Sequence, residues 1–198
     1  VMKVQATLDN LLSKSNGTIK VSQALEAGIS KPAFYEYVKR NNLENANNGI
    51  YYQQHAWSDY LYFIHLRCKQ AVFSHETALY LHELTDREPF NYSVTVITGY
   101  NPTNLKKDGV KVYSVKKELH HVGLTLIKTN FNNDVPVYDL ERTVCDIIRS
   151  RNSMDYQVFQ DTLKNYLKRR DKNLKLLMEY AALFRVKNVL KKYLEVLL

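Results

Sequence analysis

The first fifty residues alternate between stretches with helical periodicity and short extended stretches. Apolar side chains recur at helical spacing over residues 3–14, 21–27 and 31–41, and residues 18–20 form an extended segment between the first two helices. A glycine separates the second helix from the third, and the Asn-Gly pair at residues 48–49 is typical of a hairpin. This order of elements predicts a winged helix-turn-helix.

The middle of the chain changes from helical to extended patterning. Residues 56–70 predict a helix that joins two domains, and a short strand at 71–73 leads into a helix at 74–84 that Ser74 is placed to cap. The inner face of the joining helix is expected to carry Tyr60, Ile64 and Cys68. Four further segments are rich in β-branched or aromatic residues and predict strands, namely residues 92–98, 110–115, 124–128 and 135–138. A small, mostly antiparallel sheet is expected.

Residues 139–198 are predicted to be helical to the end. Asp139 is placed to cap the first of these helices, because a short carboxylate accepts hydrogen bonds from the unpaired amides of a first turn. Glu141 at its start and Arg149 and Arg151 at its end match the helix dipole. This amphipathic helix is expected to bury one stripe, made of Leu140, Val144, Ile147 and Ile148.

These patterns predict an α+β protein of two domains. Residues 1–55 would form the winged helix-turn-helix, and residues 56–198 a domain in which a small mixed or antiparallel sheet (71–138) precedes a helical bundle (139–198). A composition of 45% hydrophobic and 24% charged residues is that of a folded protein. No membrane span or signal peptide is apparent, and the two cysteines form no framework, so we expect no membrane partner and a cytoplasmic location.

The net charge of +8 favours an acidic partner, but its distribution does not single out one binding site. Residues 1–55 hold six Lys/Arg against four Asp/Glu, whereas residues 139–198 hold thirteen against eight. Most of the positive surplus therefore lies near the C-terminus, away from the segment that most resembles a DNA-binding domain.

The histidines do not predict a metal site. His75 and His82 would share one face of a helix but lie roughly 10 Å apart along its axis, too far to share one ion. His120 and His121 are adjacent and would point to opposite sides of a strand. The chain also lacks a glycine-rich phosphate loop, so we expect no cofactor.

An enzyme that acts on nucleic acid is an alternative. Asp134, Asp139 and Glu141 cluster near a predicted strand end, where nuclease carboxylates often lie. However, no lysine follows at a suitable spacing, and two of the three carboxylates already have a role at a helix start. We therefore expect no catalytic residues and no enzymatic activity.

The N-terminal segment carries the residue types that DNA recognition needs. Lys and Arg hold phosphates, whereas exposed Ser, Asn, Tyr and Arg side chains can reach base edges in the major groove. The candidate DNA-binding residues are Lys20, Ser22, Ser30, Lys31, Tyr35, Lys39, Arg40, Asn47 and Asn48. Tyr35 could instead belong to the core, and the whole segment could be a small three-helix domain used only for packing.

A second basic surface is possible near the C-terminus. It would be formed by Lys164, Lys168, Arg169, Arg170, Lys172 and Lys175. Solvated helix ends carry similar charges, because cations also suit the dipole there, and this alternative is favoured.

Three segments resemble one known family. They are Phe-Ser-His-Glu-Thr-Ala-Leu-Tyr-Leu-His-Glu-Leu (73–84), Val-Tyr-Asp-Leu-Glu-Arg-Thr-Val-Cys-Asp-Ile-Ile-Arg-Ser-Arg (137–151) and the terminal residues 193–198. Together they are similar to the AbiEi antitoxins of bacterial abortive-infection and type IV toxin–antitoxin operons. The resemblance implies an N-terminal winged-helix domain and a C-terminal antitoxin domain, but no catalytic residues.

The same resemblance implies two activities and two partners. The first activity is repression of the operon's own promoter through double-stranded DNA with inverted repeats, often cooperatively. The second is neutralisation of a nucleotidyltransferase toxin, AbiEii, without a stable complex. The alternatives are the nucleic-acid enzyme described above and an interaction module that sequesters its partner.

Overall fold

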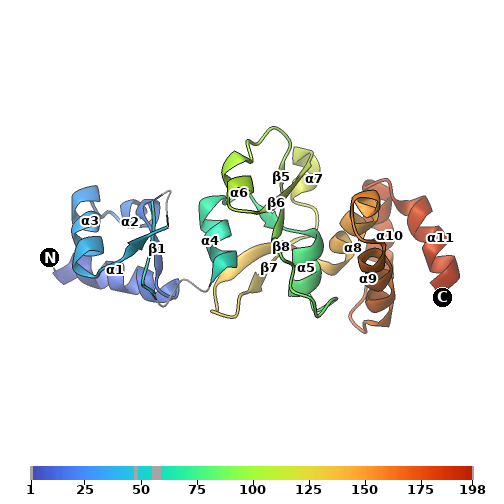
Figure 1. Ribbon diagram of the computed structural model, residues 1–198, viewed down its shortest axis with the longest axis horizontal. Helices are drawn as coiled ribbons and strands as arrows, with labels where there is room; N and C mark the ends of the chain where they lie inside the picture. The colour runs from blue at the N-terminus through green and yellow to red at the C-terminus, as the bar shows by residue number, and fades with distance from the viewer. Residues whose placement is uncertain (1, 47–48, 55–58, 198) are drawn as a thin grey trace. The chain divides into compact units, whose positions relative to one another are not determined.

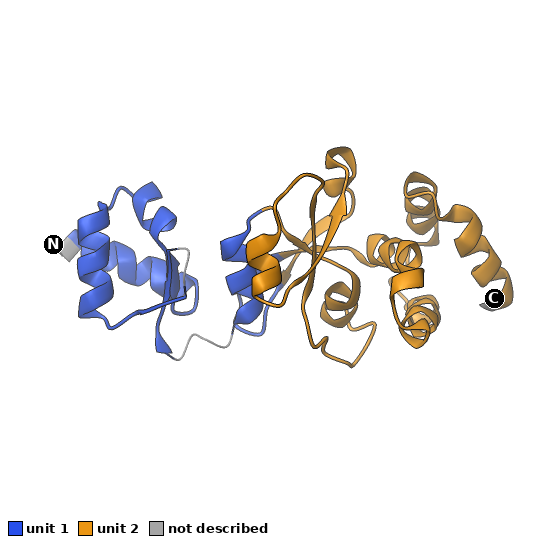
Figure 2. Cartoon of the chain, turned by 45° about the horizontal axis from the view of Figure 1, so that its top comes forward, with its two compact units in different colours: residues 1–69, 128–135 blue, residues 70–127, 136–198 orange. Residues whose placement is uncertain are grey.

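The chain divides into two compact units. The computed structural model describes residues 2–46, 49–54 and 59–197. Unit 1 comprises residues 1–69 and 128–135, and unit 2 comprises residues 70–127 and 136–198 (Figure 2). The predicted domain boundary, between residues 55 and 56, lies outside the described residues.

Unit 1 contains the predicted order of N-terminal elements. They are α1 (Met2–Lys14), β1 (Thr18–Lys20), α2 (Val21–Glu26), α3 (Lys31–Arg40), β2 (Glu44–Asn45), β3 (Ile50–Tyr52) and α4 (Tyr60–Arg67) (Figure 1). Strand β3 pairs antiparallel with both β1 and β2. The predicted helices and the pairing of the hairpin strands are confirmed to within one or two residues, while their assignment as a winged helix-turn-helix stays a prediction.

The core of unit 1 explains why these short elements are stable together. Leu8 and Leu12 of α1, Ile19 of β1 and Phe34 of α3 are buried against one another. Short helices are marginal alone, so burial of these apolar faces provides most of their stability. Gly28, at φ +78°, allows the tight turn between α2 and α3, a conformation that favours glycine.

Helix α4 is shorter than predicted, and residues 56–58 of the predicted helix lie outside the described residues. It begins at Asp59, whose Oδ1 accepts from the Tyr62 amide at 3.1 Å. The expectation that Tyr60 lies on the inner face is wrong, because its side chain is 38% exposed. Ile64 and Cys68 are buried as expected, and Phe63 and Leu66 are buried with them.

Unit 2 contains most of a five-stranded sheet. Its strands are β4 (Val72–Phe73), β5 (Ser93–Ile97), β6 (Lys111–Val115), β7 (Leu124–Lys128) and β8 (Asp134–Tyr138), in the order β6-β5-β4-β8-β7. The expectation of a mixed sheet is confirmed. The expectation of mostly antiparallel pairing is wrong for β5–β6 and β4–β8, which are parallel. A parallel pair needs a crossover, and the unpredicted helix α6 (Thr103–Lys107) provides it between β5 and β6.

Helix α5 (His75–Leu81) begins where the sequence predicts, but its cap differs. Ser74 occupies the capping position without making the side-chain bond to the first turn. The hydroxyl of Ser93, on strand β5, accepts from the Thr77 amide at 3.1 Å instead. The Ser74 hydroxyl accepts from Thr95 at 2.8 Å, so the cap predicted from local sequence is replaced by one from a neighbouring strand.

The C-terminal region is helical, as predicted. After the short α7 (Lys117–His120) and the rest of the sheet come α8 (Leu140–Arg149), a 3-10 turn (Arg151–Ser153), α9 (Tyr156–Lys168), α10 (Leu174–Leu183) and α11 (Lys187–Leu197). Helix α8 contacts α5 on one side and α9 and α10 on others (Figure 1).

Helix α8 is not the one-sided amphipathic helix that the sequence predicts. Val144, Ile147 and Ile148 are buried as expected, but every residue from 141 to 148 is buried and Leu140 is only half-buried. The helix is covered from several directions, so its charged residues Glu141, Arg142 and Asp146 lie inside the unit, while Arg149 at its end is exposed. No helix among the described residues combines the length and apolar character needed to span a bilayer.

Candidate functional site

Helix α3 has a buried face and an exposed, positively charged face. Phe34 and Tyr37 point into the core of unit 1. Lys31, Tyr35 and Lys39 are exposed and follow one another at intervals of four residues, which places them on one side of the helix. The buried face fixes the helix, and the opposite face presents two cations and an aromatic ring to solvent.

Arg40 extends this exposed face at the end of α3. Its Nη1 donates to the Gln5 side chain at 3.4 Å, a long bond that leaves the other donors available. Glu36 is the acidic residue of the helix and is also exposed. Across residues 2–46, 49–54 and 59–197, the structure records no ion pair between a carboxylate and Lys31, Lys39 or Arg40.

The start of α3 adds positive potential to the same face. The Ser30 hydroxyl accepts from the Ala33 amide at 3.5 Å, and Pro32 lies in the first turn, where a missing amide hydrogen costs nothing. The remaining amides and the helix dipole favour an anion at this end, beside the Lys31 side chain.

Tyr35 connects α3 to the hairpin. Its side chain is 47% exposed, and its ring meets Tyr51 of β3 edge-on, with centroids 6.1 Å apart. Phe34 contacts the same ring at 5.5 Å. Burial, followed by the neighbouring Tyr35 phenol, raises the pKa of Tyr51. Tyr35 therefore packs against the hairpin and still exposes part of its surface, so its role in DNA binding stays a prediction.

Lys20 and Ser22 are less available than the sequence suggests. The Lys20 ammonium donates to the Leu66 carbonyl of α4 at 2.6 Å, and burial together with Lys69 lowers its pKa. Ser22 is half-buried, and its hydroxyl oxygen is shielded from solvent. Asn47 and Asn48 lie outside the described residues.

The predicted C-terminal basic surface separates into two groups. The Arg169 guanidinium forms two 2.8 Å bonds with Asp171 and a third, of 3.0 Å, with the His82 carbonyl, while the Lys172 ammonium donates to the Arg169 carbonyl at 2.9 Å. These two side chains therefore hold the connection between α9 and α10. The exposed members of the set are Lys164, Lys168, Arg170 and Lys175.

The three carboxylates considered for catalysis have structural partners. Asp139 Oδ1 accepts from the Arg142 amide at 2.8 Å, which confirms the predicted cap. Glu141 Oε1 accepts from the Tyr166 hydroxyl and the Asn173 amide, each at 2.8 Å. Asp134 pairs with Lys128 at 3.2 Å. These bonds tie helices and strands together rather than grouping the carboxylates around one reacting position.

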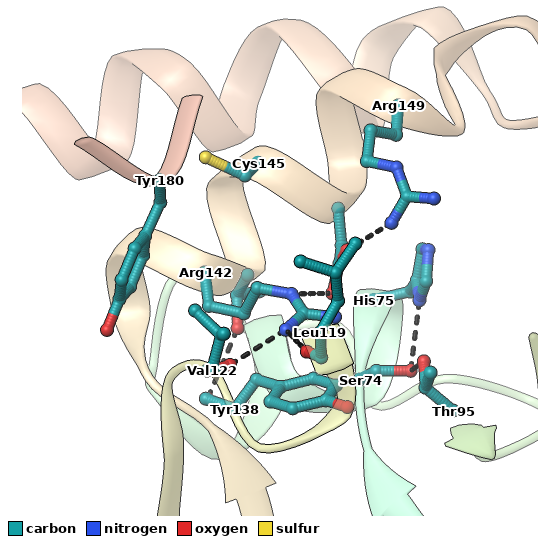
Figure 3. Close-up of polar contacts among 12 residues, drawn as sticks. Ser74, His75, Thr95, Leu119, Val122, Tyr138, Arg142, Cys145, Arg149 and Tyr180 are labelled. Carbon is teal, nitrogen blue, oxygen red and sulfur yellow. Dashed lines mark hydrogen bonds and ion pairs between the residues drawn. The ribbon is translucent and has the colours of Figure 1, made fainter. Parts of the chain in front are cut away.

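A buried arginine at the centre of unit 2 is not predicted from the sequence. Arg142 is 0% exposed, and its guanidinium carbon lies 3.9 Å from the Tyr138 ring centroid and 4.0 Å from that of Phe184. Arg142 donates to Asp146 at 2.9 Å and to the carbonyls of Leu119 and Val122 at 2.9 and 2.7 Å (Figure 3). Burial raises the pKa of Asp146, and Arg142 opposes this by favouring the carboxylate.

His75 is a second buried residue whose contacts the sequence does not predict. His75 adopts φ +50°, which non-glycine residues seldom do, and its ring stacks on Tyr113 with centroids 3.4 Å apart. Its two ring nitrogens lie 2.9 Å from the Ser74 hydroxyl and 3.0 Å from the Ser150 hydroxyl. Burial and then Lys111 and Arg149 lower its pKa well below the usual value.

The same contacts leave His75 without a nitrogen for a metal. His82 Nε2 lies 2.6 Å from the Tyr138 carbonyl, so that nitrogen is also committed. The described part of the chain contains no group of three His, Cys, Asp or Glu side chains that could hold an ion.

No protein-family model matches the chain, and a search of curated proteins gives no match. The function must therefore be inferred from the side chains themselves, above all from the exposed cations of α3.

Proposed function

We propose that unit 1 binds duplex DNA as a winged helix-turn-helix, with α3 in the major groove. A helix of ten residues with one face held in a core can enter the groove and present its opposite face to the bases. Lys31, Lys39 and Arg40 would contact phosphates or base edges, and Tyr35 would lie against the groove wall.

The observation that carries this proposal is the exposed stripe on α3. Its cations make no ion pair among the described residues, whereas Arg142 and Asp146 of α8 form a buried ion pair. Exposed cations that are held on a rigid element and lack a carboxylate partner suit phosphate binding, because they release counterions when they meet DNA. The alternative of a packing domain would leave this stripe without a role.

The function that we propose for the whole chain is that of an AbiEi-like antitoxin and autorepressor. The resemblance of residues 73–84 and 137–151 to that family supports it. In this proposal the protein binds inverted repeats in its own promoter, and unit 2 counteracts a nucleotidyltransferase toxin without a stable complex. No enzymatic role is proposed for Asp139 and Glu141, since both support helices.

A gel-shift assay with the chain's own promoter fragment tests the DNA-binding part. The double variant Lys31→Ala/Arg40→Ala should weaken binding by about tenfold or more, because two contacts with the charged backbone are lost. The matched control Lys168→Ala/Lys175→Ala removes the same charge from exposed positions of unit 2 and should bind like the wild type. Unchanged affinity in the α3 variant would exclude this helix as the reading helix.

A growth assay, run beside a promoter reporter, tests the antitoxin part separately. Co-expression with the nucleotidyltransferase encoded by a neighbouring gene should restore growth even when the α3 variant no longer represses the promoter. Loss of both activities in a variant that remains folded would contradict the division of roles between the units.

A further inference from the structure

Helices α9 and α11 border an open groove in unit 2 that the DNA-binding proposal does not use. The groove has a volume of about 500 Å³, within the range of about 300–1,000 Å³ found for ligand sites. Its apolar lining consists of Tyr156, Leu163, Val189, Tyr193 and Val196. Both helices therefore contribute apolar side chains to one continuous surface.

Two of these apolar side chains are open to solvent. Tyr156 is 62% exposed and Val196 is 82% exposed. Beneath them the surface is well ordered by packing, because Tyr193 meets the buried Phe159 edge-on with ring centroids 4.8 Å apart. Exposed apolar side chains on a rigid floor are typical of an anchoring pocket in a protein interface.

The charged residues that line the groove are all positive. They are Arg151, Lys164 and Lys192, and among the described residues no carboxylate belongs to the lining. The Arg151 guanidinium donates to the Ile148 carbonyl at 2.8 Å, which fixes it at one border of the groove. In the described part of the chain, Lys164 and Lys192 form no ion pair. A complementary partner would carry negative charge beside its apolar side chains.

The apolar lining favours a protein partner over a nucleic acid. In a nucleic acid, phosphates could pair with the three cations and bases could stack on a tyrosine, but the aliphatic Val189 and Val196 offer no ring for stacking. An amphipathic helix offers apolar side chains at positions i, i+3, i+4 and i+7 for the groove and acidic side chains along its borders for the cations. It satisfies both parts of the lining at once.

We propose that the α9–α11 groove binds an acidic amphipathic helix of a partner protein. The apolar residues of that helix insert between Tyr156 and Val196, and its carboxylates meet Arg151, Lys164 and Lys192. This interaction is independent of the DNA-binding face on α3, so the chain could hold a protein and a duplex through different units.

Fluorescence anisotropy on the full chain with a labelled synthetic peptide tests the proposal. The peptide carries Leu at i, i+3, i+4 and i+7 with Glu along both borders, and we expect a dissociation constant on the order of 10 μM. A peptide of the same composition in scrambled order, and one with Lys in place of Glu, should bind at least about tenfold more weakly.

Variants of the chain locate the binding surface. Lys164→Glu/Lys192→Glu should weaken peptide binding about tenfold or more, whereas the matched Lys168→Glu/Lys175→Glu, with the same change in charge outside the groove, should have little effect. Val196→Ser should also weaken binding, and Leu126→Ser, a change of another exposed apolar residue, should not.

Three outcomes would overturn the proposal. Equal binding of the ordered and scrambled peptides, or equal loss in both lysine pairs, would show that no shaped groove is involved. If a single-stranded oligonucleotide binds the wild type, loses binding in Lys164→Glu/Lys192→Glu and is not displaced by the peptide, the groove is a nucleic-acid site instead.

Discussion

Helices α3 and α8 have the same length and similar ends, but they place their charges in opposite environments. Each spans ten residues and begins at a side-chain oxygen that accepts from the first turn. The cations of α3 face solvent without carboxylate partners among the described residues, while Arg142 of α8 is enclosed by Asp146, two carbonyls and two aromatic rings.

The difference follows from how many elements cover each helix. Helix α3 buries one face in a small core, so its other side stays open to a ligand. Helix α8 is covered by α5, α9 and α10, so the charges on its buried residues, Glu141, Arg142 and Asp146, need partners inside the unit. Charges on α3 are therefore expected to matter for binding, and charges on α8 for stability.

The largest effect is expected from Arg142→Met. Removing the guanidinium leaves Asp146 buried without its main partner, which should cost about 3–5 kcal/mol of unfolding free energy. Denaturant titration of both proteins measures the difference. Arg149→Met is the matched control, because Arg149 binds the same carboxylate at 3.3 Å from a more exposed position and should cost less than about 1 kcal/mol. Equal losses of unfolding free energy in the two variants would contradict a stabilising role for the buried Arg142–Asp146 pair.

The next largest effect concerns the turn that covers α8. A side chain at Gly123, which has φ +73°, would bring a Cβ within 2.6 Å of the Arg142 Cβ. Gly109 has φ +76° but open space around it, so Gly109→Ala isolates the backbone strain, about 1–2 kcal/mol. Thermal unfolding should show Gly123→Ala to be less stable than Gly109→Ala by about 1–3 kcal/mol. Indistinguishable midpoints would argue against close packing of this turn on Arg142.

Acid should destabilise unit 2 through His75. Its pKa is lowered in the folded protein, so the unfolded chain takes up the proton first as the pH falls. The contribution of the neutral His75 ring to the free energy of unfolding is fully present above about pH 6.5. It is lost below that pH, at up to about 1.4 kcal/mol per pH unit. Denaturant titrations between pH 7.5 and about pH 5 should show that the unfolding free energy falls less steeply in His75→Asn than in the wild type. Asn tolerates positive φ and does not titrate. An unchanged slope would contradict a neutral, buried imidazole.

The N-terminal caps of α3 and α8 also differ, and here the expected effect on stability is smaller. Asp139 accepts at 2.8 Å in a half-buried position, whereas Ser30 accepts at 3.5 Å on the surface. Asp139→Ala should therefore cost about 1–2 kcal/mol, and Ser30→Ala about 0.5 kcal/mol. Chemical denaturation of the two variants in parallel checks the order, and the reverse order would be inconsistent with these geometries.

The smallest effect on stability is expected on α3 itself. Lys31→Ala/Arg40→Ala removes exposed charges with no carboxylate partner in the described residues, so the unfolding free energy should change by no more than about 0.5 kcal/mol. Thermal unfolding in parallel with the gel-shift assay separates folding from binding. A loss of several degrees in the unfolding midpoint would mean that these side chains hold the domain together.

Much of the fold could be predicted because its signals are local. The spacing of Leu8 and Leu12, the serine before Pro32 and the carboxylate of Asp139 each fix an element within a few residues, and all three act as predicted. The exposure of Lys31 and Lys39 also follows from helical periodicity once Phe34 is placed in the core.

The remaining features depend on contacts between distant residues. Parallel pairing of β4 with β8 joins Phe73 to Val137, which no local pattern indicates. The bond from Lys20 to Leu66 and the replacement of Ser74 by Ser93 as a helix cap also join segments far apart in sequence. Arg142 and Asp146 gave a visible signal, an oppositely charged pair at i and i+4, but that pattern is also typical of a solvated helix face.

The salt dependence of promoter binding tests the central claim most directly. The logarithm of the dissociation constant of the wild type should rise linearly with the logarithm of salt concentration, and Lys31→Ala/Arg40→Ala should reduce that slope by about 2. Lys168→Ala/Lys175→Ala should leave the slope unchanged. A slope that is the same in all three proteins, or that falls equally in both variants, would contradict the assignment of DNA binding to the exposed face of α3.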